Sequence, residues 1–137
     1  MYLTNRLIYL ENFYLIYCCY KTKFKVFLNG SNSELLKKFN EINRKDKSIN
    51  KFVLVIESIK CGFANKSQFN WEDRCDLGEI YAIKVDQHRF YTLVCKNQGY
   101  KELYISRYGK KQSQTNDKKL QTTIDSIKQI SIQKLLE

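Results

Sequence analysis

The apolar residues change their spacing once along this chain, and that change limits the possible folds more than any other feature. Between residues 33 and 61 they recur every three or four positions, as in two amphipathic helices: Leu35, Leu36, Phe39 and Ile42, then Phe52, Val53, Val55, Ile56 and Ile59. After residue 77 they alternate, as in half-buried strands: Tyr81, Ile83 and Val85, then Phe90, Thr92 and Val94, then Leu103 and Ile105. The sequence therefore predicts a helical hairpin followed by a three-stranded antiparallel meander.

Small and polar residues indicate where these helices begin and end. Asn32 or Ser33 can cap the first helix, because a short polar side chain can accept a hydrogen bond from the free backbone N–H groups of the first turn. The second helix is expected from about Ile49, and Gly62 is a natural stop. The polar segment 65–76 that follows is expected to form a packed loop.

The N-terminal part is rich in Tyr, Phe, Ile and Leu. Residues 5–29 predict one long strand or a hairpin, ended by the Asn29-Gly30 turn. The apolar run 7–20 contains Glu11, lacks a small-residue cleavage site and is too short to span a bilayer. A strand of the core is therefore expected there, rather than a signal peptide or a membrane segment.

The last predicted element is a helix that starts at about Asn116 or Asp117. Its apolar residues at helical spacing are Leu120, Ile124, Ile127 and Ile130. The predicted order is β-α-α-β-β-β-α, an α+β fold in which an antiparallel sheet carries the helical hairpin on one face. A single domain, residues 1–137, is expected, because a chain of this length can bury one core and no internal repeat is visible.

The net charge of +10 is concentrated in two blocks. Residues 21–51 carry nine basic and three acidic side chains, and residues 77–119 carry nine basic and four acidic ones. Such blocks attract phosphate backbones, anionic membrane surfaces or acidic proteins. A surface that serves only solubility is the alternative.

The residue patterns of common catalytic sites are missing from the sequence. There is no glycine-rich phosphate loop and no nucleophile elbow, and the single histidine, His88, lies at a predicted turn, where surface residues are commoner than catalysts. The five cysteines form no CxxC pair, which favours free thiols in a cytoplasmic protein over disulfides or a zinc site. Catalysis in this chain is therefore expected to use Lys, Arg and Tyr.

Strand parity predicts which polar side chains share a face of the meander. If the connection at 86–89 has an even number of loop residues, pairing Val85 with Phe90, the alternating apolar sets all pack on the helices. The opposite, exposed face then carries Lys84, Arg89 and Tyr91. If Leu103 and Ile105 also point to the core, Tyr108 joins that face, which Lys110 and Lys111 flank. Cations hold phosphates and rings stack on unpaired bases, so this face is a candidate RNA-binding surface. A solvated face with tyrosines packed on lysine stems is the alternative.

Three stretches of the chain carry a family resemblance. They are FVLVIESIKCGF, LGEIYAIKVDQHRFYTLV and LYISRYGKKQSQTND. The first is similar to a helix pair that ends in a Gly-containing turn. The second is similar to a Gly-Leu-Tyr-Glu-Leu-Arg strand followed by an Arg-rich strand, and the third to a strand that ends in a Lys-Lys-Thr-Gln-type loop. In these features residues 33–130 resemble the RelE/HigB superfamily, particularly its phage-derived HigB-like branch.

The resemblance implies the toxin of a type II toxin–antitoxin pair. Such a protein is an mRNA endonuclease that works without a metal or other cofactor, usually on the ribosome, and is neutralised by a cognate antitoxin, here expected to be of the helix-turn-helix type. Lys84 falls where the family has the Arg of its second strand, and Arg89 matches an Arg of the third. Lys110 and Lys111 match its paired lysines, whereas Tyr91 stands where a second Arg is frequent, and Ser106-Arg107 replaces the usual His-Gly.

Two functions are compatible with these residues. In a toxin, Lys84 and Arg89 would bind the scissile phosphate, and Tyr91 or Tyr108 would orient a base or assist proton transfer. Flanking phosphates or ribosomal RNA would be bound by Lys110, Lys111, Arg107, Lys37 and Lys38. In a non-catalytic module, the same scaffold would bind RNA, DNA or an acidic partner without cleavage. A third possibility is that the run 7–20 pairs with another chain through an exposed edge.

Overall fold

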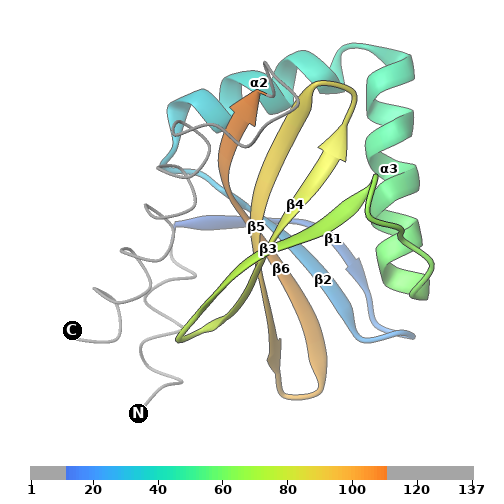
Figure 1. Cartoon of the computed structure of the whole chain (residues 1–137), viewed down its shortest axis with the longest axis vertical. Coiled ribbons are helices and arrows are strands. Elements are labelled where there is room, and N and C mark those ends of the chain that lie inside the picture. Colours follow the sequence, from blue (N-terminus) through green and yellow to red (C-terminus); the bar gives the residue numbers. More distant parts are fainter. Residues whose placement is uncertain (1–11, 111–137) are drawn as a thin grey trace.

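The alternating and helical patterns fold into six strands and two helices within residues 12–110, the part of the chain that the computed structural model describes (Figure 1). The elements are β1 (Phe13–Cys19), β2 (Phe24–Asn29), α2 (Ser33–Asn43), α3 (Asp46–Cys61), β3 (Phe69–Cys75), β4 (Gly78–Val85), β5 (His88–Asn97) and β6 (Tyr100–Lys110). The α+β class is confirmed. The predicted C-terminal helix from residue 116 lies outside the described residues.

The six strands form one mixed sheet in the order β1-β2-β6-β5-β4-β3. Strands joined by short turns pair antiparallel, and β2 and β6 pair in parallel, with Phe24 opposite Lys101 and Leu28 opposite Ile105. The prediction of a purely antiparallel sheet is therefore wrong. A tight turn can join only antiparallel neighbours, whereas β2 and β6 are separated by the helices and three strands and are free to run the same way.

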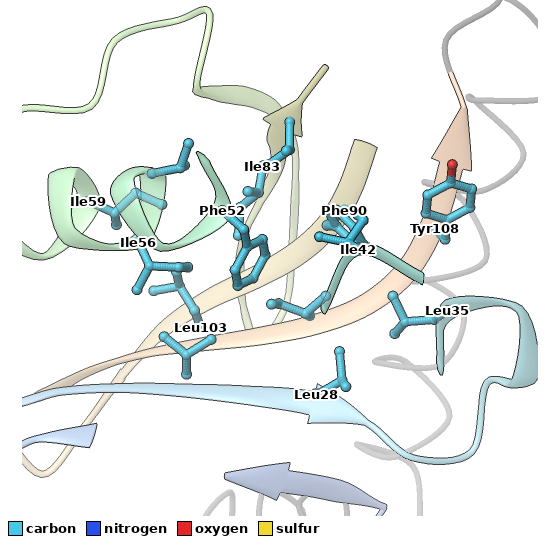
Figure 2. Packing of buried hydrophobic residues seen from close by; sticks show 14 of the residues in the cluster. Leu28, Leu35, Ile42, Phe52, Ile56, Ile59, Ile83, Phe90, Leu103 and Tyr108 are labelled. Atoms are coloured by element: carbon cyan, nitrogen blue, oxygen red, sulfur yellow. The ribbon is translucent and has the colours of Figure 1, made fainter. Parts of the chain in front are cut away.

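The helices α2 and α3 pack together on one face of the sheet, as predicted (Figure 2). The ring of Phe52 in α3 lies edge-on to Phe39 of α2, with 5.4 Å between centroids, and to Phe90 of β5, at 5.7 Å. The buried cluster comprises Phe24, Val26, Leu28, Leu35, Ile42, Phe52, Val55, Ile56, Ile59, Ile83, Val85, Phe90, Leu103, Ile105 and Tyr108. One core thus joins both helices to the four central strands.

The predicted helix signals were mostly correct. The Asn32 side chain caps α2 by accepting from the Leu35 backbone N–H at 2.8 Å, and Gly62 ends α3 with φ of +79°. Helix α3 begins at Asp46, before the predicted Ile49. The assignment of Val53 to the core was wrong, because the buried stripe of α3 follows residues 52, 55, 56 and 59, and Val53 is 48% exposed beside it.

The segment predicted as a packed loop contains a strand. Residues 69–75 pair antiparallel with β4, and Phe69 stacks on Tyr81 with 4.2 Å between ring centroids. A register shift between Trp71 and Asp73 interrupts the pairing. This interruption and the polar composition hide the strand, because an edge strand takes much of its stability from backbone pairing with its neighbour.

The N-terminal hairpin is present, but its first strand is not a core strand. Residues 5–11 lie outside the described part, and β1 occupies an edge of the described sheet. Tyr14 is 63% exposed and Leu15 51%, whereas β2 supplies the buried residues of this hairpin. The hydroxyl of Tyr17 donates to Glu57 of α3 at 2.9 Å, which fastens β1 to the helix layer. Within residues 12–110, no helix is long and apolar enough to cross a membrane.

Two neighbouring valines of α3 provide a test of this helix orientation. We expect Val55→Ala to lower the free energy of unfolding by about 1.6 kcal/mol, because it removes two buried methylene equivalents at roughly 0.8 kcal/mol each. Val53→Ala should change it by no more than about 0.5 kcal/mol, since that side chain is half exposed. Urea unfolding of the two variants measures the difference, and an equal loss in both would show that Val53 belongs to the core.

Candidate nucleic-acid interface

The β4–β5 hairpin fixes the orientation of the predicted phosphate-binding residues. Its loop has two residues, and the register pairs Val85 with His88, Lys84 with Arg89 and Ile83 with Phe90. The supposed even loop length holds, but the loop has two residues instead of the four at 86–89, so the partner of Val85 is His88 rather than Phe90. Directly opposed residues share a face, so Lys84 and Arg89 lie side by side on the face away from the helices.

A bulge in β6 reverses the predicted orientation of Tyr108. Tyr91 pairs with Arg107 and Thr92 with Ile105, which leaves Ser106 as an extra residue in β6. One extra residue turns every later side chain to the other face. Arg107 therefore joins Tyr91, and Tyr108 packs with the helix-side core, 5.6 Å from Phe90 between ring centroids (Figure 2). The prediction that Tyr108 shares a face with Tyr91 was wrong.

The face away from the helices is buried instead of exposed. Its cluster comprises Ile80, Ala82, Tyr91, Leu93, Cys95 and Tyr104, and neither α2 nor α3 contributes to it. Tyr91 is only 2% exposed, so its ring does not offer a surface for base stacking. Lys84, Arg89 and Arg107 keep partial exposure around this cluster. The cations of the predicted interface are therefore accessible in part, and its central aromatic ring is not.

On the helix side of the same sheet end, Tyr108 meets the only histidine of the chain. His88 Nδ1 and Tyr108 Oη are 2.5 Å apart. Lys38 of α2 extends over the Tyr108 ring, with Nζ 5.8 Å from its centroid, and Lys110 is the register partner of His88. The Arg89 guanidinium donates to the carbonyl oxygen of His88 at 3.1 Å. We call these five residues, His88, Arg89, Tyr108, Lys38 and Lys110, the His88 cluster; Arg89 lies on the opposite face and joins it through the His88 backbone.

The environment of the two titratable rings in this cluster, His88 and Tyr108, keeps both neutral near pH 7. Burial lowers the pKa of His88, and the positive charges of Lys38 and Lys110 lower it further, against the raising effect of Asp86. Burial raises the pKa of Tyr108, so its phenol stays protonated. A neutral imidazole can accept a proton, and the cations around it can hold an anionic substrate.

The predicted site residues therefore fall into two groups at one end of the sheet. Lys84, Arg89, Tyr91 and Arg107 share the face away from the helices, and Lys38, Tyr108 and Lys110 surround His88 on the helix side. Lys37 is exposed on α2, and Lys111 lies outside the described residues. Within residues 12–110, no three His, Cys, Asp or Glu side chains gather as a metal site, and all five cysteines are free thiols.

Sequence reasoning missed His88 as a member of the site. The available signal was parity, because His88 stands two residues before the core residue Phe90 and must share its face. Its partner Tyr108 was expected on the opposite face, so the contact between the two rings could not be foreseen.

The pKa of His88 can be measured directly, since its resonance is the only histidine signal in a proton NMR titration. We expect a value below about 6.5, the ordinary histidine pKa. Lys38→Gln should raise this value, because it removes a positive charge that disfavours the imidazolium. Lys37→Gln, which removes the same charge from an exposed neighbouring position, should leave it unchanged. Equal shifts in both variants would contradict the contact of Lys38 with the cluster.

No family model, curated protein or solved structure matches this chain. The resemblance to the RelE/HigB superfamily therefore stays a hypothesis that rests on the three sequence stretches.

Proposed function

We propose that this protein is the toxin of a type II toxin–antitoxin pair, an endoribonuclease that cuts mRNA, usually on the ribosome, and thereby inhibits translation. The observation that carries the proposal is the gathering of cations from four elements, α2, β4, β5 and β6, at one end of the sheet. These cations are Lys38, Lys84, Arg89, Arg107 and Lys110. Two further features support it: the helical hairpin on one face of the sheet and the three sequence stretches that resemble the RelE/HigB superfamily.

Positive groups of this kind suit RNA cleavage without a metal. RNA carries its own nucleophile, the 2′-hydroxyl, so a protein need only align the scissile phosphate, stabilise its developing charge and assist proton transfer. Lys84 and Arg89 lie next to each other across β4 and β5 and would hold that phosphate. Arg107 and Lys110 would bind the flanking phosphates, and a cognate antitoxin of the helix-turn-helix type would block access.

One observation favours a second function, a non-catalytic RelE-like module that binds nucleic acid or an acidic partner. Tyr91 and Tyr108 are two of the four residues predicted to be catalytic, and they are only 2% and 6% exposed. Because these phenols are buried, binding of nucleic acid by the cations alone requires fewer accessible residues than catalysis does. It predicts strong salt dependence and no cleavage.

Inducible expression in a bacterial host, followed by mapping of mRNA 5′ ends, tests the toxin proposal. We expect growth arrest and new cleavage sites with the wild-type chain. The Arg89→Ala/Lys110→Ala variant should cleave at least about a hundredfold more slowly, because it loses Arg89, which stabilises transition-state charge, and Lys110, which binds a flanking phosphate. Lys21→Ala/Lys96→Ala, which removes the same charge at the opposite end of the sheet, should arrest growth like the wild type.

Healthy growth with intact mRNA and abundant soluble wild-type protein would contradict the toxin proposal. Equal loss of activity in both double variants would show that net charge matters rather than this end of the sheet.

The salt dependence of RNA binding distinguishes where the RNA lies, whether or not it is cut. For a single-stranded oligonucleotide, each phosphate contact contributes about 0.7 to the slope of log K against log salt. Arg89→Ala/Lys110→Ala should therefore reduce the slope by about 1.4, measured by fluorescence anisotropy between low and moderate salt. Lys21→Ala/Lys96→Ala should leave the slope unchanged, and the reverse pattern would place the RNA at the other end of the sheet.

A further inference from the structure

His88 is held in a defined orientation beside the proposed phosphate-binding cations. Its Nδ1 atom is within 2.5 Å of Tyr108 Oη, and its ring lies 5.6 Å from the Tyr108 ring and 6.3 Å from the Phe90 ring, between centroids. Tyr108 and Phe90 belong to the buried core, so both are themselves fixed. Since Nδ1 is occupied, Nε2 is the nitrogen through which this partly exposed ring can meet a ligand.

The charges around His88 suit a proton acceptor next to an anion. Lys38 of α2 and Lys110 of β6 are the nearby cations, and Asp86 of the turn and Glu41 of α2 are the nearby carboxylates. Both carboxylates are engaged by lysines: Asp86 pairs with Lys51 of α3 at 2.6 Å, and Glu41 pairs with Lys38 at 3.6 Å. Burial together with the two cations lowers the pKa of His88, so the imidazole is uncharged at pH 7.

Arg89 connects this histidine to the phosphate site. It follows His88 in β5, and its Nη1 atom donates to the carbonyl oxygens of Asp86 and His88 at 3.0 and 3.1 Å. The guanidinium is thereby held over the turn that carries the imidazole. A phosphate bound by Arg89 would therefore lie next to the turn that carries His88.

We propose that His88 is the proton acceptor of the RNA cleavage and that Tyr108 is its positioning residue. This inference rests on the proposed function and deepens it, because it names the base and restricts the substrate to RNA with a 2′-hydroxyl at the cut. In the tautomer whose Nδ1–H donates to Tyr108 Oη, the lone pair of Nε2 is available.

The step balances without any further reactant except water. Nε2 takes the proton of the 2′-hydroxyl while that oxygen forms a bond to phosphorus, and the bond from phosphorus to the 5′-oxygen breaks. The 5′-oxygen takes a proton from water, and the imidazolium later returns its proton to the solvent. The products are a 2′,3′-cyclic phosphate and a 5′-hydroxyl, and Lys84 and Arg89 offset the charge that develops on the phosphate.

The test uses the purified full chain with a synthetic mRNA, both free and bound to ribosomes. We expect His88→Gln to lower kcat by about a hundredfold or more, the scale of general base catalysis, with unchanged RNA binding. Tyr108→Phe should lower kcat by up to about tenfold without changing KM, as expected for the loss of one hydrogen bond that orients the base. Gln87→Ala, an exposed neighbour in the same turn, should behave like the wild type. A 2′-deoxy substitution at the cut should prevent cleavage.

The wild-type pH profile gives a measurement that does not depend on the folding of any variant. The rate should rise with pH along an acid limb whose midpoint equals the His88 pKa measured by NMR in the RNA-bound protein. A limb that does not follow this pKa would overturn the inference. So would wild-type rates in His88→Gln, or a loss of RNA binding in that variant with its circular dichroism unchanged.

These results are distinguishable from a failure of the proposed function. Cleavage by the wild type together with full activity in His88→Gln removes the role of His88 and leaves the ribonuclease standing. No cleavage of free or ribosome-bound mRNA by the wild type removes both.

Discussion

The edge-on packing of Phe52 against Phe39 and Phe90 is the contact on which the rest of this structure depends. It joins α2, α3 and the central strand β5 through one buried ring. Phe90 in turn contacts Tyr108, and Tyr108 contacts His88, so a continuous row of aromatic rings leads from the middle of the core to the end of the sheet. Aromatic rings in such a row have little freedom to move, because protein interiors are closely packed. The proposed site is thus oriented by the same core that holds the fold together.

The bulge at Ser106 determines which rings can meet at that end. Ser106 is buried, its hydroxyl donates to the carbonyl oxygen of Tyr104, and its own carbonyl accepts from the side chain of Asn29 in β2. Without the extra residue, Tyr108 would turn toward Tyr91, and Arg107 would turn toward the helices. The bulge therefore brings the phenol to the imidazole and leaves Arg107 on the same face as Lys84 and Arg89. Bulges commonly redirect a side chain in this way next to functional sites.

The two sides of the sheet end differ in what they offer an RNA chain. On the helix side, a neutral imidazole and a protonated phenol lie among lysines. On the other side, three partly exposed cations lie on the same face as a buried apolar cluster. A proton acceptor needs the first environment, because burial and neighbouring cations keep it uncharged. Phosphate binding suits the second, because partly exposed cations are accessible to a phosphate group, whose binding releases counterions. A proton acceptor and phosphate-binding cations at the same end of the sheet are the physical reason for proposing catalysis rather than binding alone.

Local chemistry was readable from the sequence, and long-range pairing was not. The Asn32 cap, the Gly62 stop and the amphipathic helices depend on residues within a few positions of each other, so their patterns can be read from the chain. The strand β3, the parallel pairing of β2 with β6 and the exposure of β1 depend on partners that the sequence does not name. The candidate cations were identified from strand parity, yet their grouping changed, because one extra residue in β6 reverses every later side chain. The sequence by itself determined which cations are candidates for binding RNA, because parity along a strand is a local property. Only the tertiary structure decided that Tyr108 meets His88 and that Tyr91 is buried, because both depend on pairing between distant strands.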